Sequence, residues 1–466
     1  MEKRPIRSAL VVLLLYTLLT ILLTWPLLPH LHTHVLGPEK ADNYEYVWQL
    51  WWVPHALFDL GASPYFQPNI YYPSGYPLAY GEITPLHTFF LMPLVRGLGE
   101  VTTYNLIMLT STTLSAWTTY FLARRWLRPM VGDNAMLLAM CSFTVGCSFA
   151  FSQYQLVRFA GHLPLIATHW VVLALFALDR WLVERNQRDA ILIGLSVSFA
   201  ALASWYYAFM LALILPLYTL LRAENLRGLL AERRTWASAG LALVITAVLC
   251  VPFLTPYLQL ARDGDTAVPL DSAAFWSASP VDYLVPNPQH PLWGQFAQHL
   301  IWPFGGRAPG EFMSASVGWV TLLFGLIGWR QARGKNWRAL KWLALLAFVL
   351  SLGLILNFSR IPTGIPMPAM LLSRILPGAD SLRSWGRFSV FVHLAFSLLA
   401  GAGLATWAMR RPPRFHLTVA AVVCVVLLFS LWIGPAPLVP VEPRPVDRWL
   451  ADQPADFAIM QYPVDV

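Results

Sequence analysis

Long apolar runs recur along the whole chain and are separated by polar segments. The first run, ALVVLLLYTLLTILLTWPLL, covers residues 9–28. About 20 apolar residues suffice to cross a bilayer as a helix, so this run predicts a membrane span. It follows Lys3, Arg4 and Arg7 as a signal peptide would, but its apolar core is too long and no small-residue cleavage site follows, which favours an uncleaved span.

Ten further runs predict ten further spans. They lie at 104–127, 134–152, 163–181, 190–204, 205–221, 236–258, 314–329, 340–356, 388–409 and 417–434. The fifth and sixth spans share one continuous apolar run, and Ser204 marks where they would separate. The expected fold is an all-α polytopic membrane protein with about 11 transmembrane helices.

Composition agrees with this reading. Of the 466 residues, 57% are hydrophobic and only 12% are charged, whereas a soluble domain carries about 25% charged residues. All four cysteines (Cys141, Cys147, Cys250 and Cys424) fall inside predicted spans, where they are expected to behave as small apolar residues rather than as disulfides or metal ligands.

The distribution of charge predicts the orientation. With the N-terminus in the cytoplasm, the cytoplasmic segments hold 21 of the 32 Lys and Arg residues and 7 of the 24 acidic residues. Cytoplasmic loops of membrane proteins are rich in Lys and Arg, so an N-in, C-out arrangement is predicted. The net charge of +8 then reflects topology and gives no reason to invoke nucleic acid.

The predicted external loops are long, at about 29–103, 259–313, 357–387 and 435–466. In the first of them, residues 43–60 suit an interfacial helix, with Glu45 and Gln49 on one face and Pro54 expected to kink or divide it. Residues 64–85 are dense in proline and tyrosine, and the prolines exclude a regular helix there.

The later external loops carry further chemistry. The second contains His290 and, just before the eighth span, Glu311. The third external loop contains four arginines, although Lys and Arg are expected mainly in cytoplasmic loops. This exception predicts an anionic partner. The four arginines are Arg360, Arg374, Arg383 and Arg387.

This layout resembles the GT-C superfamily of membrane glycosyltransferases, which use polyprenyl-phosphate sugars. The resemblance covers most of the chain and rests on one early span, a large first external loop with an early Asp and interfacial helices, and many further spans. More narrowly, the chain resembles uncharacterised bacterial multi-pass members with a PNP-x-HP loop, here Pro286–Pro291, and an R-x-x-x-RF stretch, here Arg383–Phe388.

The resemblance implies an inverting glycosyltransferase on the outer face of a bacterial plasma membrane, working in cell-envelope glycan assembly. Asp42 matches the early acid and would be the general base, with Glu82 as the second candidate. Arginine would stabilise the departing phosphate. The predicted partners are a polyprenyl-phosphate sugar, the bilayer, and a glycan, lipid or protein acceptor. The expected substrate-binding residues are Glu45, Tyr72, His162, His290, Glu311, Arg383 and Arg387.

Each candidate has a plainer alternative. Asp42-x-x-Glu45 has the spacing of a helix capping box, and Glu82 could be a loop acid or a partner for a metal or Arg. His162 and His290 could be structural residues, and Glu311 would need a partner or water near the membrane edge. Arg383 and Arg387 could bind lipid headgroups, and the loop tyrosines could be packing. The sequence establishes no cofactor with certainty, and a divalent metal stays open.

A transporter or flippase for lipid-linked or small polar substrates is the alternative function, and an assembly protein is a third. A transporter should place ionisable groups in mid-span, whereas the predicted spans here are nearly free of charge and the acids lie in external loops. Residues 1–434 would form the transmembrane domain and 435–466 the start of a soluble external domain that continues past Val466, with a helix at 446–451 and a strand at 457–463.

Overall fold

The structure is a computed structural model of the 466-residue chain, and it is almost entirely helical. It describes residues 4–39, 41–159, 161–264, 266–286, 289–301, 315–358, 361–454 and 457–459. The predicted substrate-binding residue Glu311 lies outside the described residues, as does Arg360.

Each of the eleven apolar runs forms a helix. These helices are α1 (Arg4–Leu23), α5 (Glu100–Val131), α6 (Ala135–Ala150), α9 (Thr168–Glu184), α10 (Gln187–Ala203), α11 (Trp205–Arg222), α13 (Arg233–Asp263), α17 (Trp319–Gln331), α18 (Lys335–Ser351), α20 (Ser389–Met409) and α21 (His416–Leu431). Ser204 separates α10 from α11 in an extended conformation, with φ −154° and ψ 130°. The fifth and sixth runs are therefore two helices.

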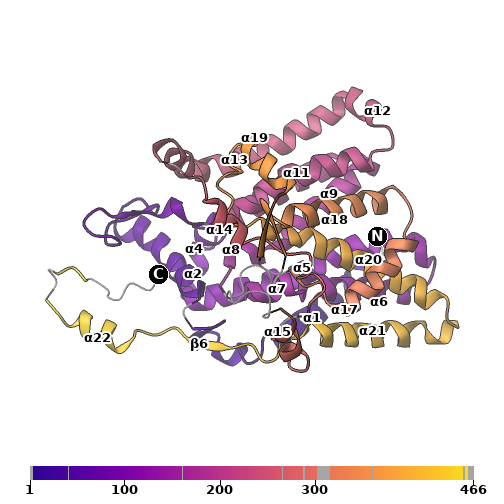
Figure 1. Ribbon diagram of the computed structural model, residues 1–466, viewed down its shortest axis with the longest axis horizontal. Helices are drawn as coiled ribbons and strands as arrows, with labels where there is room; N and C mark the ends of the chain where they lie inside the picture. The colour runs from indigo at the N-terminus through magenta and orange to yellow at the C-terminus, as the bar shows by residue number, and fades with distance from the viewer. Residues whose placement is uncertain are drawn as a thin grey trace.

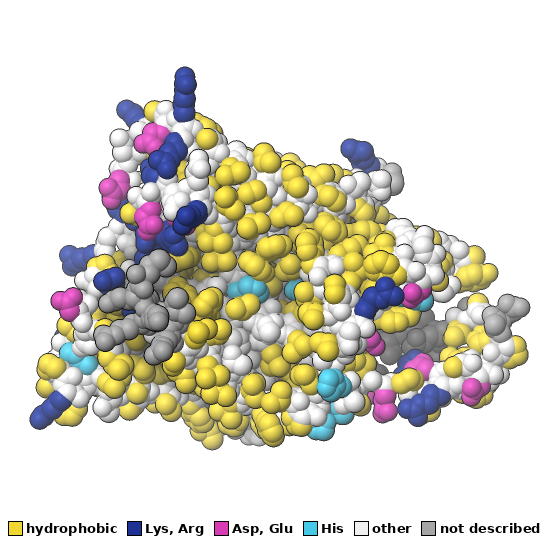
Figure 2. Space-filling view, turned by 180° about the vertical axis from the view of Figure 1, so that it is seen from behind, with side chains coloured by type: hydrophobic (Ala, Val, Ile, Leu, Met, Phe, Trp, Pro, Cys, Tyr) yellow, Lys and Arg dark blue, Asp and Glu magenta, His cyan; other side chains and the backbone are white. Residues whose placement is uncertain are grey.

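The molecule is a multi-pass membrane protein. Within the described residues, six helical stretches are long and apolar enough to cross a bilayer, and Ser8–Leu23 is a shorter apolar helix. Figure 2 shows a broad hydrophobic surface across the middle of the molecule, with most charged side chains gathered toward its two ends. The count of 11 spans and their N-in orientation stay predictions.

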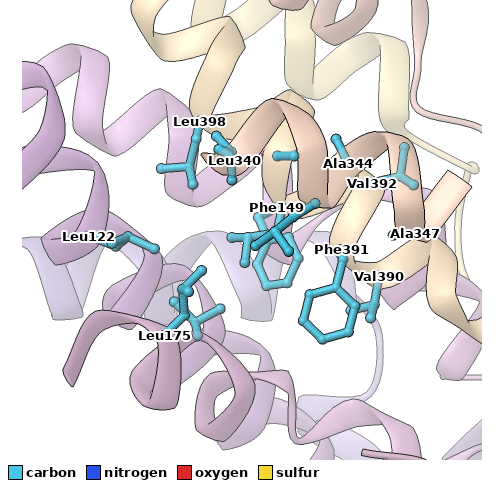
Figure 3. Close-up of a cluster of buried hydrophobic side chains, with 14 of the residues drawn as sticks. Leu122, Phe149, Leu175, Leu340, Ala344, Ala347, Val390, Phe391, Val392 and Leu398 are labelled. Atoms are coloured by element: carbon cyan, nitrogen blue, oxygen red, sulfur yellow. The ribbon is translucent and has the colours of Figure 1, made fainter. Parts of the chain in front are cut away.

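Helix α20 lies at the centre of the bundle, and 94% of an 18-residue apolar stretch within Trp385–Met409 is buried. It packs closely on α17 because both helices carry glycine where they meet. A Cβ atom at Gly328 would lie 1.9 Å from the Leu399 carbonyl oxygen, and one at Gly403 would lie 2.0 Å from the Phe324 carbonyl oxygen. Small residues allow this approach of two membrane helices. Figure 3 shows side chains of α5, α6, α9, α18 and α20 meeting in the apolar core.

One buried carboxylate ties three helices together at the end predicted to face the cytoplasm. Asp179 on α9 accepts hydrogen bonds from Arg125 Nε at 3.0 Å and Trp126 Nε1 at 3.1 Å on α5. It also accepts from Tyr218 Oη at 2.7 Å and Arg222 Nε at 3.2 Å on α11. A buried charge is costly unless it is paired and hydrogen-bonded, and here every lone-pair direction has a donor. This acid therefore has a structural role.

Shorter elements fill the segments between the long helices. The helices are α2 (Asn43–Pro54), α3 (Pro85–Thr88), α4 (Met92–Leu98), α7 (Gln153–Arg158), α8 (Leu163–Ile166), α12 (Leu226–Ala231), α14 (Leu270–Phe275), α15 (Gly294–Ile301), α19 (Pro368–Ile375) and α22 (Pro445–Ala451). A π-helical turn, His55–Asp59, continues α2 after Pro54, where the sequence predicts a kink or division. Single 3-10 turns lie at Leu28–His30, Leu78–Tyr80, Trp385–Phe388 and Pro413–Phe415.

Three two-stranded antiparallel sheets complete the described structure. They are β1 (His34–Leu36) with β6 (Leu438–Pro440), β2 (Phe66–Gln67) with β3 (Tyr76–Pro77), and β4 (Ile355–Phe358) with β5 (Ile361–Pro366). The pair β1–β6 joins the segment after α21 to the first loop. Figure 1 shows α2, α4, β6 and α22 at one end of the molecule and α12 at the other.

The predicted C-terminal elements are found in part. Helix α22 confirms the helix expected at 446–451. The strand expected at 457–463 is wrong for residues 457–459, which have no regular structure, and 460–463 lie outside the described residues. Without a described neighbouring strand, a short apolar segment has no ladder of hydrogen bonds to hold it extended.

Candidate functional site

The loop between α7 and α8 packs against the start of α2 and forms one side of the candidate site. Gly161 has φ +120°, and a Cβ atom there would lie 2.5 Å from the Asn43 backbone nitrogen and 2.9 Å from that of Asp42. Only glycine adopts this conformation at so close an approach without strain. The contact fixes the backbone that carries Asp42.

Asp42 immediately precedes α2, but its side chain does not cap the helix. The residue has helical dihedral angles, φ −63° and ψ −8°, and its carboxylate makes no hydrogen bond to the first turn. The capping-box alternative is therefore wrong. The side chain is exposed, yet the surrounding protein displaces enough water to raise the pKa of Asp42, while the charges of Arg383 and Arg387 lower it.

Glu45 lies one turn further along α2. It accepts a hydrogen bond from Gln49 Nε2 at 3.0 Å, as the i, i+4 spacing predicts. A Cβ atom at Gly81 would lie 3.8 Å from Glu45 Oε1, so the end of the tyrosine-rich segment adjoins this acid. Burial raises the pKa of Glu45, and the negative charge of Asp42 raises it further.

Glu82 follows Gly81 in the sequence, and its side chain binds the start of α11. Its Oε1 accepts hydrogen bonds from Ser204 Oγ at 2.8 Å and from the Trp205 backbone N–H at 3.0 Å. The break at Ser204 thus exposes backbone donors that a carboxylate can satisfy. Burial raises the pKa of Glu82, and the charge of Arg387 together with these hydrogen bonds opposes the rise.

Two of the arginines of the third loop, Arg383 and Arg387, act on the same acids. Arg387 lies in the turn Trp385–Phe388 that leads into α20, and it is 92% buried, with 8% of its surface exposed. Its guanidinium carbon lies 4.2 Å from the ring centroid of Tyr206. Arg383 is exposed, and its guanidinium carbon lies 5.0 Å from the ring centroid of Trp276. Both cations lower the pKa of Asp42, and Arg387 also lowers that of Glu82.

Tyr46 stands among these groups, and sequence reasoning missed it. Burial raises its pKa well above the usual value; Glu82, Glu45 and Asp42 add to the rise, and Arg387 opposes it. Glu82, Glu45, Asp42 and Arg387 are therefore the charged groups that act on this side chain. Its position four residues after Asp42, on the same helix face, is the signal that could have found it. Tyr206, likewise missed, follows the Ser204 break by two residues.

The other predicted site residues lie apart from this cluster or at its edge. His162 follows Gly161 and directly precedes α8. Tyr72 is 69% exposed on the tyrosine-rich segment. His290 has both ring nitrogens engaged by backbone: Nε2 lies 2.9 Å from the Phe429 carbonyl oxygen, and Nδ1 lies 3.1 Å from the Leu292 nitrogen. Its ring also stacks on Trp293 at 3.8 Å, so its contacts are those of a structural residue.

Among the described residues, no group of three His, Cys, Asp or Glu side chains is arranged to hold a metal ion. The described cluster instead combines carboxylates with two guanidinium groups and tyrosine rings. Such a set can accept a proton at one point and stabilise an anionic oxygen at another. These two capacities lie on four segments that are remote in sequence.

Comparison with known proteins bears on the fold. A family model described as "Domain of unknown function (DUF6311)" matches residues 10–430. No curated protein matches the chain. The chain is similar in structure to the arabinofuranosyltransferase AftD from Mycobacteria, with a TM-score of 0.52 and 16% identity, over 96% of this chain and 28% of that one.

A mutant of AftD gives a TM-score of 0.54, also at 16% identity, over 96% of this chain and 30% of that one. A crystal structure of the Archaeoglobus fulgidus oligosaccharyltransferase gives 0.48 at 14% identity, over 91% of this chain and 53% of that one. The chain thus spans less than a third of the length of AftD. At these identities the likeness to AftD establishes the fold, which is GT-C-like, as the resemblance in the sequence implies.

Proposed function

Because the chain belongs to the DUF6311 family and has a GT-C-like fold, we propose that it is a membrane glycosyltransferase. It transfers a sugar from a polyprenyl-phosphate donor to an acceptor hydroxyl, with inversion, on the outer face of the plasma membrane. The AftD likeness makes a pentose such as arabinofuranose the first sugar to test.

One observation supports this most. Asp42, Glu82 and Arg387 come from segments far apart in the chain. The charge of Arg387 acts on both carboxylates, and all three charges act on Tyr46. A carboxylate beside a buried guanidinium matches the two charges that a glycosyl transfer develops: a proton leaves the acceptor, and negative charge grows on the departing phosphate.

The residues divide these tasks. Asp42 is exposed and not engaged in capping, so its carboxylate takes the proton of the acceptor hydroxyl as that oxygen attacks the anomeric carbon. The bond from this carbon to the phosphate oxygen breaks, and its electron pair stays on the phosphate. Arg387 and Arg383 stabilise that charge by hydrogen bonds. Attack from the face opposite the phosphate inverts the anomeric centre.

Glu82 takes a positioning role in this scheme. Its carboxylate already accepts hydrogen bonds from Ser204 and Trp205, which leaves it less able to accept a substrate proton than Asp42. Its charge faces Arg387 and holds that guanidinium near the cluster. The order of the two candidate bases, Asp42 before Glu82, is therefore supported by their contacts.

The test uses the purified full chain in nanodiscs with a panel of polyprenyl-phosphate pentoses and hexoses. We expect one donor to be consumed, with polyprenyl phosphate released and the sugar found on a cell-envelope acceptor. If no donor is consumed with any envelope fraction, while labelled polyprenyl-linked sugar crosses the bilayer of proteoliposomes, the enzyme proposal fails in favour of a flippase.

A further inference from the structure

Three tyrosines of the first external loop form a continuous row that is exposed at both ends. The ring centroids of Tyr71 and Tyr76 are 5.4 Å apart, and those of Tyr76 and Tyr80 are 5.8 Å apart with an angle of 26° between the rings. Tyr71 is 73% exposed and Tyr80 is 56% exposed, whereas Tyr76 between them is half-buried. We call these three residues the tyrosine row.

The segment that carries the row is ordered by its own core. Trp52 Nε1 donates a hydrogen bond to the Pro64 carbonyl at 3.0 Å, and the Leu78 backbone N–H donates to the Tyr65 carbonyl at 2.8 Å. Strands β2 and β3 pair at its base. Leu78 and Ile83 are buried under the same segment. The exposed rings therefore stand on a fixed platform, so a ligand that binds them has little loop entropy to overcome.

The row leads to the acids of the candidate site. Tyr80 is followed by Gly81, which adjoins Glu45, and then by Glu82. The negative charge of Glu45 also helps to raise the pKa of Tyr76. A molecule lying along the row would thus have one end beside the carboxylates, where the proposed reaction takes place.

The charge of the segment that carries the row favours a neutral ligand and disfavours an anionic membrane surface. Between residues 43 and 95 the chain has no Lys or Arg, and its charged residues are Glu45, Asp59 and Glu82. Segments that bind anionic headgroups are basic, so this one is unsuited to them. Tyrosine rings instead offer flat apolar faces with a hydroxyl at the rim and few rotatable bonds. These suit the C–H faces and hydroxyls of a sugar.

We propose that the tyrosine row is the acceptor subsite and that it holds a carbohydrate chain whose growing end reaches the acids at Glu45 and Asp42. The proposal rests on the proposed function and deepens it, because it selects a glycan among the glycan, lipid and protein acceptors.

The test measures binding of linear pentose and hexose tetra- and octasaccharides to the detergent-purified full chain. We expect at least one octasaccharide to bind, with its tetrasaccharide weaker. The double variant Tyr71→Ala/Tyr80→Ala should bind about tenfold or more weakly, since the loss of aromatic rings that a ligand covers acts on this scale. Phe58→Ala is the matched control: Phe58 is 57% exposed in the same loop but packs with Arg96, and its loss should leave binding unchanged.

Asp42→Asn separates this proposal from the function it rests on, because it should keep oligosaccharide binding whether or not turnover is lost. Unchanged oligosaccharide binding in the double variant, or no binding of any oligosaccharide to the wild type, overturns the row as a glycan subsite.

A fluorophore on Tyr71→Cys should be quenched by aqueous iodide in nanodiscs. Quenching by brominated acyl chains would overturn the proposal in favour of a bilayer contact.

Discussion

The guanidinium of Arg387 lies over the ring of Tyr206, 4.2 Å from its centroid. This contact joins the turn before α20 to the first turn of α11. Glu82 binds the same end of α11 through Ser204 and Trp205. The break in the apolar run at Ser204 is thus the place where the first external loop, α11 and the start of α20 meet. The charged cluster depends on that break.

Replacing Arg387 should weaken use of the donor. If its guanidinium holds a lipid phosphate, Arg387→Gln removes a charged hydrogen bond worth about 1.5–3 kcal/mol, which is about 10- to 150-fold in donor affinity. Arg387→Lys should recover part of this, because lysine keeps the charge but loses the paired geometry. Donor titrations on purified variants measure both effects.

The matched control is Arg374→Gln, since Arg374 is an exposed arginine of the same loop on α19. Its donor affinity should match the wild type, and Arg383→Gln should fall between the two. Melting temperatures identify any variant that fails to fold. Equal donor affinity in all three Gln variants would return Arg383 and Arg387 to the lipid-headgroup interpretation.

Replacing Asp42 separates catalysis from stability. Asp42→Asn keeps the size of the side chain but removes the base, so turnover should fall about 100-fold or more. Because the carboxylate makes no capping hydrogen bond, Asp42→Ala should lose turnover equally with little change in melting temperature. Glu82→Gln should instead lower the melting temperature, because its carboxylate binds the start of α11. An active Asp42→Asn enzyme would contradict the assignment of the base.

The acid limb of the pH–rate profile should report Asp42. The base works as the carboxylate, so activity should fall as the pH drops through the pKa of Asp42, which is raised above its usual value. The positive charge of Arg387 lowers that pKa, so Arg387→Gln should move the acid limb of kcat/KM to higher pH, and Arg374→Gln should leave it in place. A limb that stays fixed or moves to lower pH in Arg387→Gln excludes the proposed interaction.

The close contact between α17 and α20 predicts a sharp sensitivity at one glycine. Gly328→Ala would place a methyl group 1.9 Å from the Leu399 carbonyl oxygen, and backbone cannot move aside cheaply. Overpacking of this kind costs about 1–3 kcal/mol, which should lower the melting temperature in detergent. Gly240→Ala is the matched control, because it also lies in a long helix but meets nothing within 4 Å. Equal melting temperatures would show that the helices can separate freely.

Much of the helical layout could be predicted because each apolar run is long enough to dictate its own structure. The sequence predicts the break at Ser204 as well, but it does not show what holds the break. Ser204 lies inside a continuous apolar run, and its side chain caps α11 by accepting a hydrogen bond from the Tyr206 backbone N–H. The hydroxyl of Ser204 donates to Glu82, 122 residues away, so a contact that no sequence window contains accompanies the break.

The site residues also divide into those that the sequence could predict and those that it could not. Asp42, Glu82, Arg383 and Arg387 could be chosen by type, since charged side chains in external loops of an apolar chain need a reason. Tyr46 and Tyr206 could not be chosen by residue type alone, because tyrosine near a membrane edge is expected at the interface in any case. The capping interpretation of Asp42 failed because the residue spacing predicts a capping box but does not fix where the carboxylate points.

The orientation of the chain in the membrane is testable at one exposed residue of the second external loop. Leu292 is 69% exposed, and the four native cysteines are buried and free, so a cysteine introduced at Leu292 can be labelled against the native background. Of the 32 Lys and Arg residues, 21 lie in the segments predicted to be cytoplasmic. This distribution predicts that the loop of Leu292 lies outside. Leu292→Cys should react with a membrane-impermeant maleimide on intact spheroplasts.

Arg227 on α12 provides the opposite side of the same experiment. It is exposed in the segment between α11 and α13, and one helix of membrane-spanning length, α13, separates it from the loop of Leu292. Arg227→Cys should therefore stay unlabelled until the cells are lysed. Labelling of Arg227→Cys on intact spheroplasts, with protection of Leu292→Cys, would invert the topology. It would also place Asp42 and the tyrosine row on the cytoplasmic side, where the proposed outer-face reaction fails.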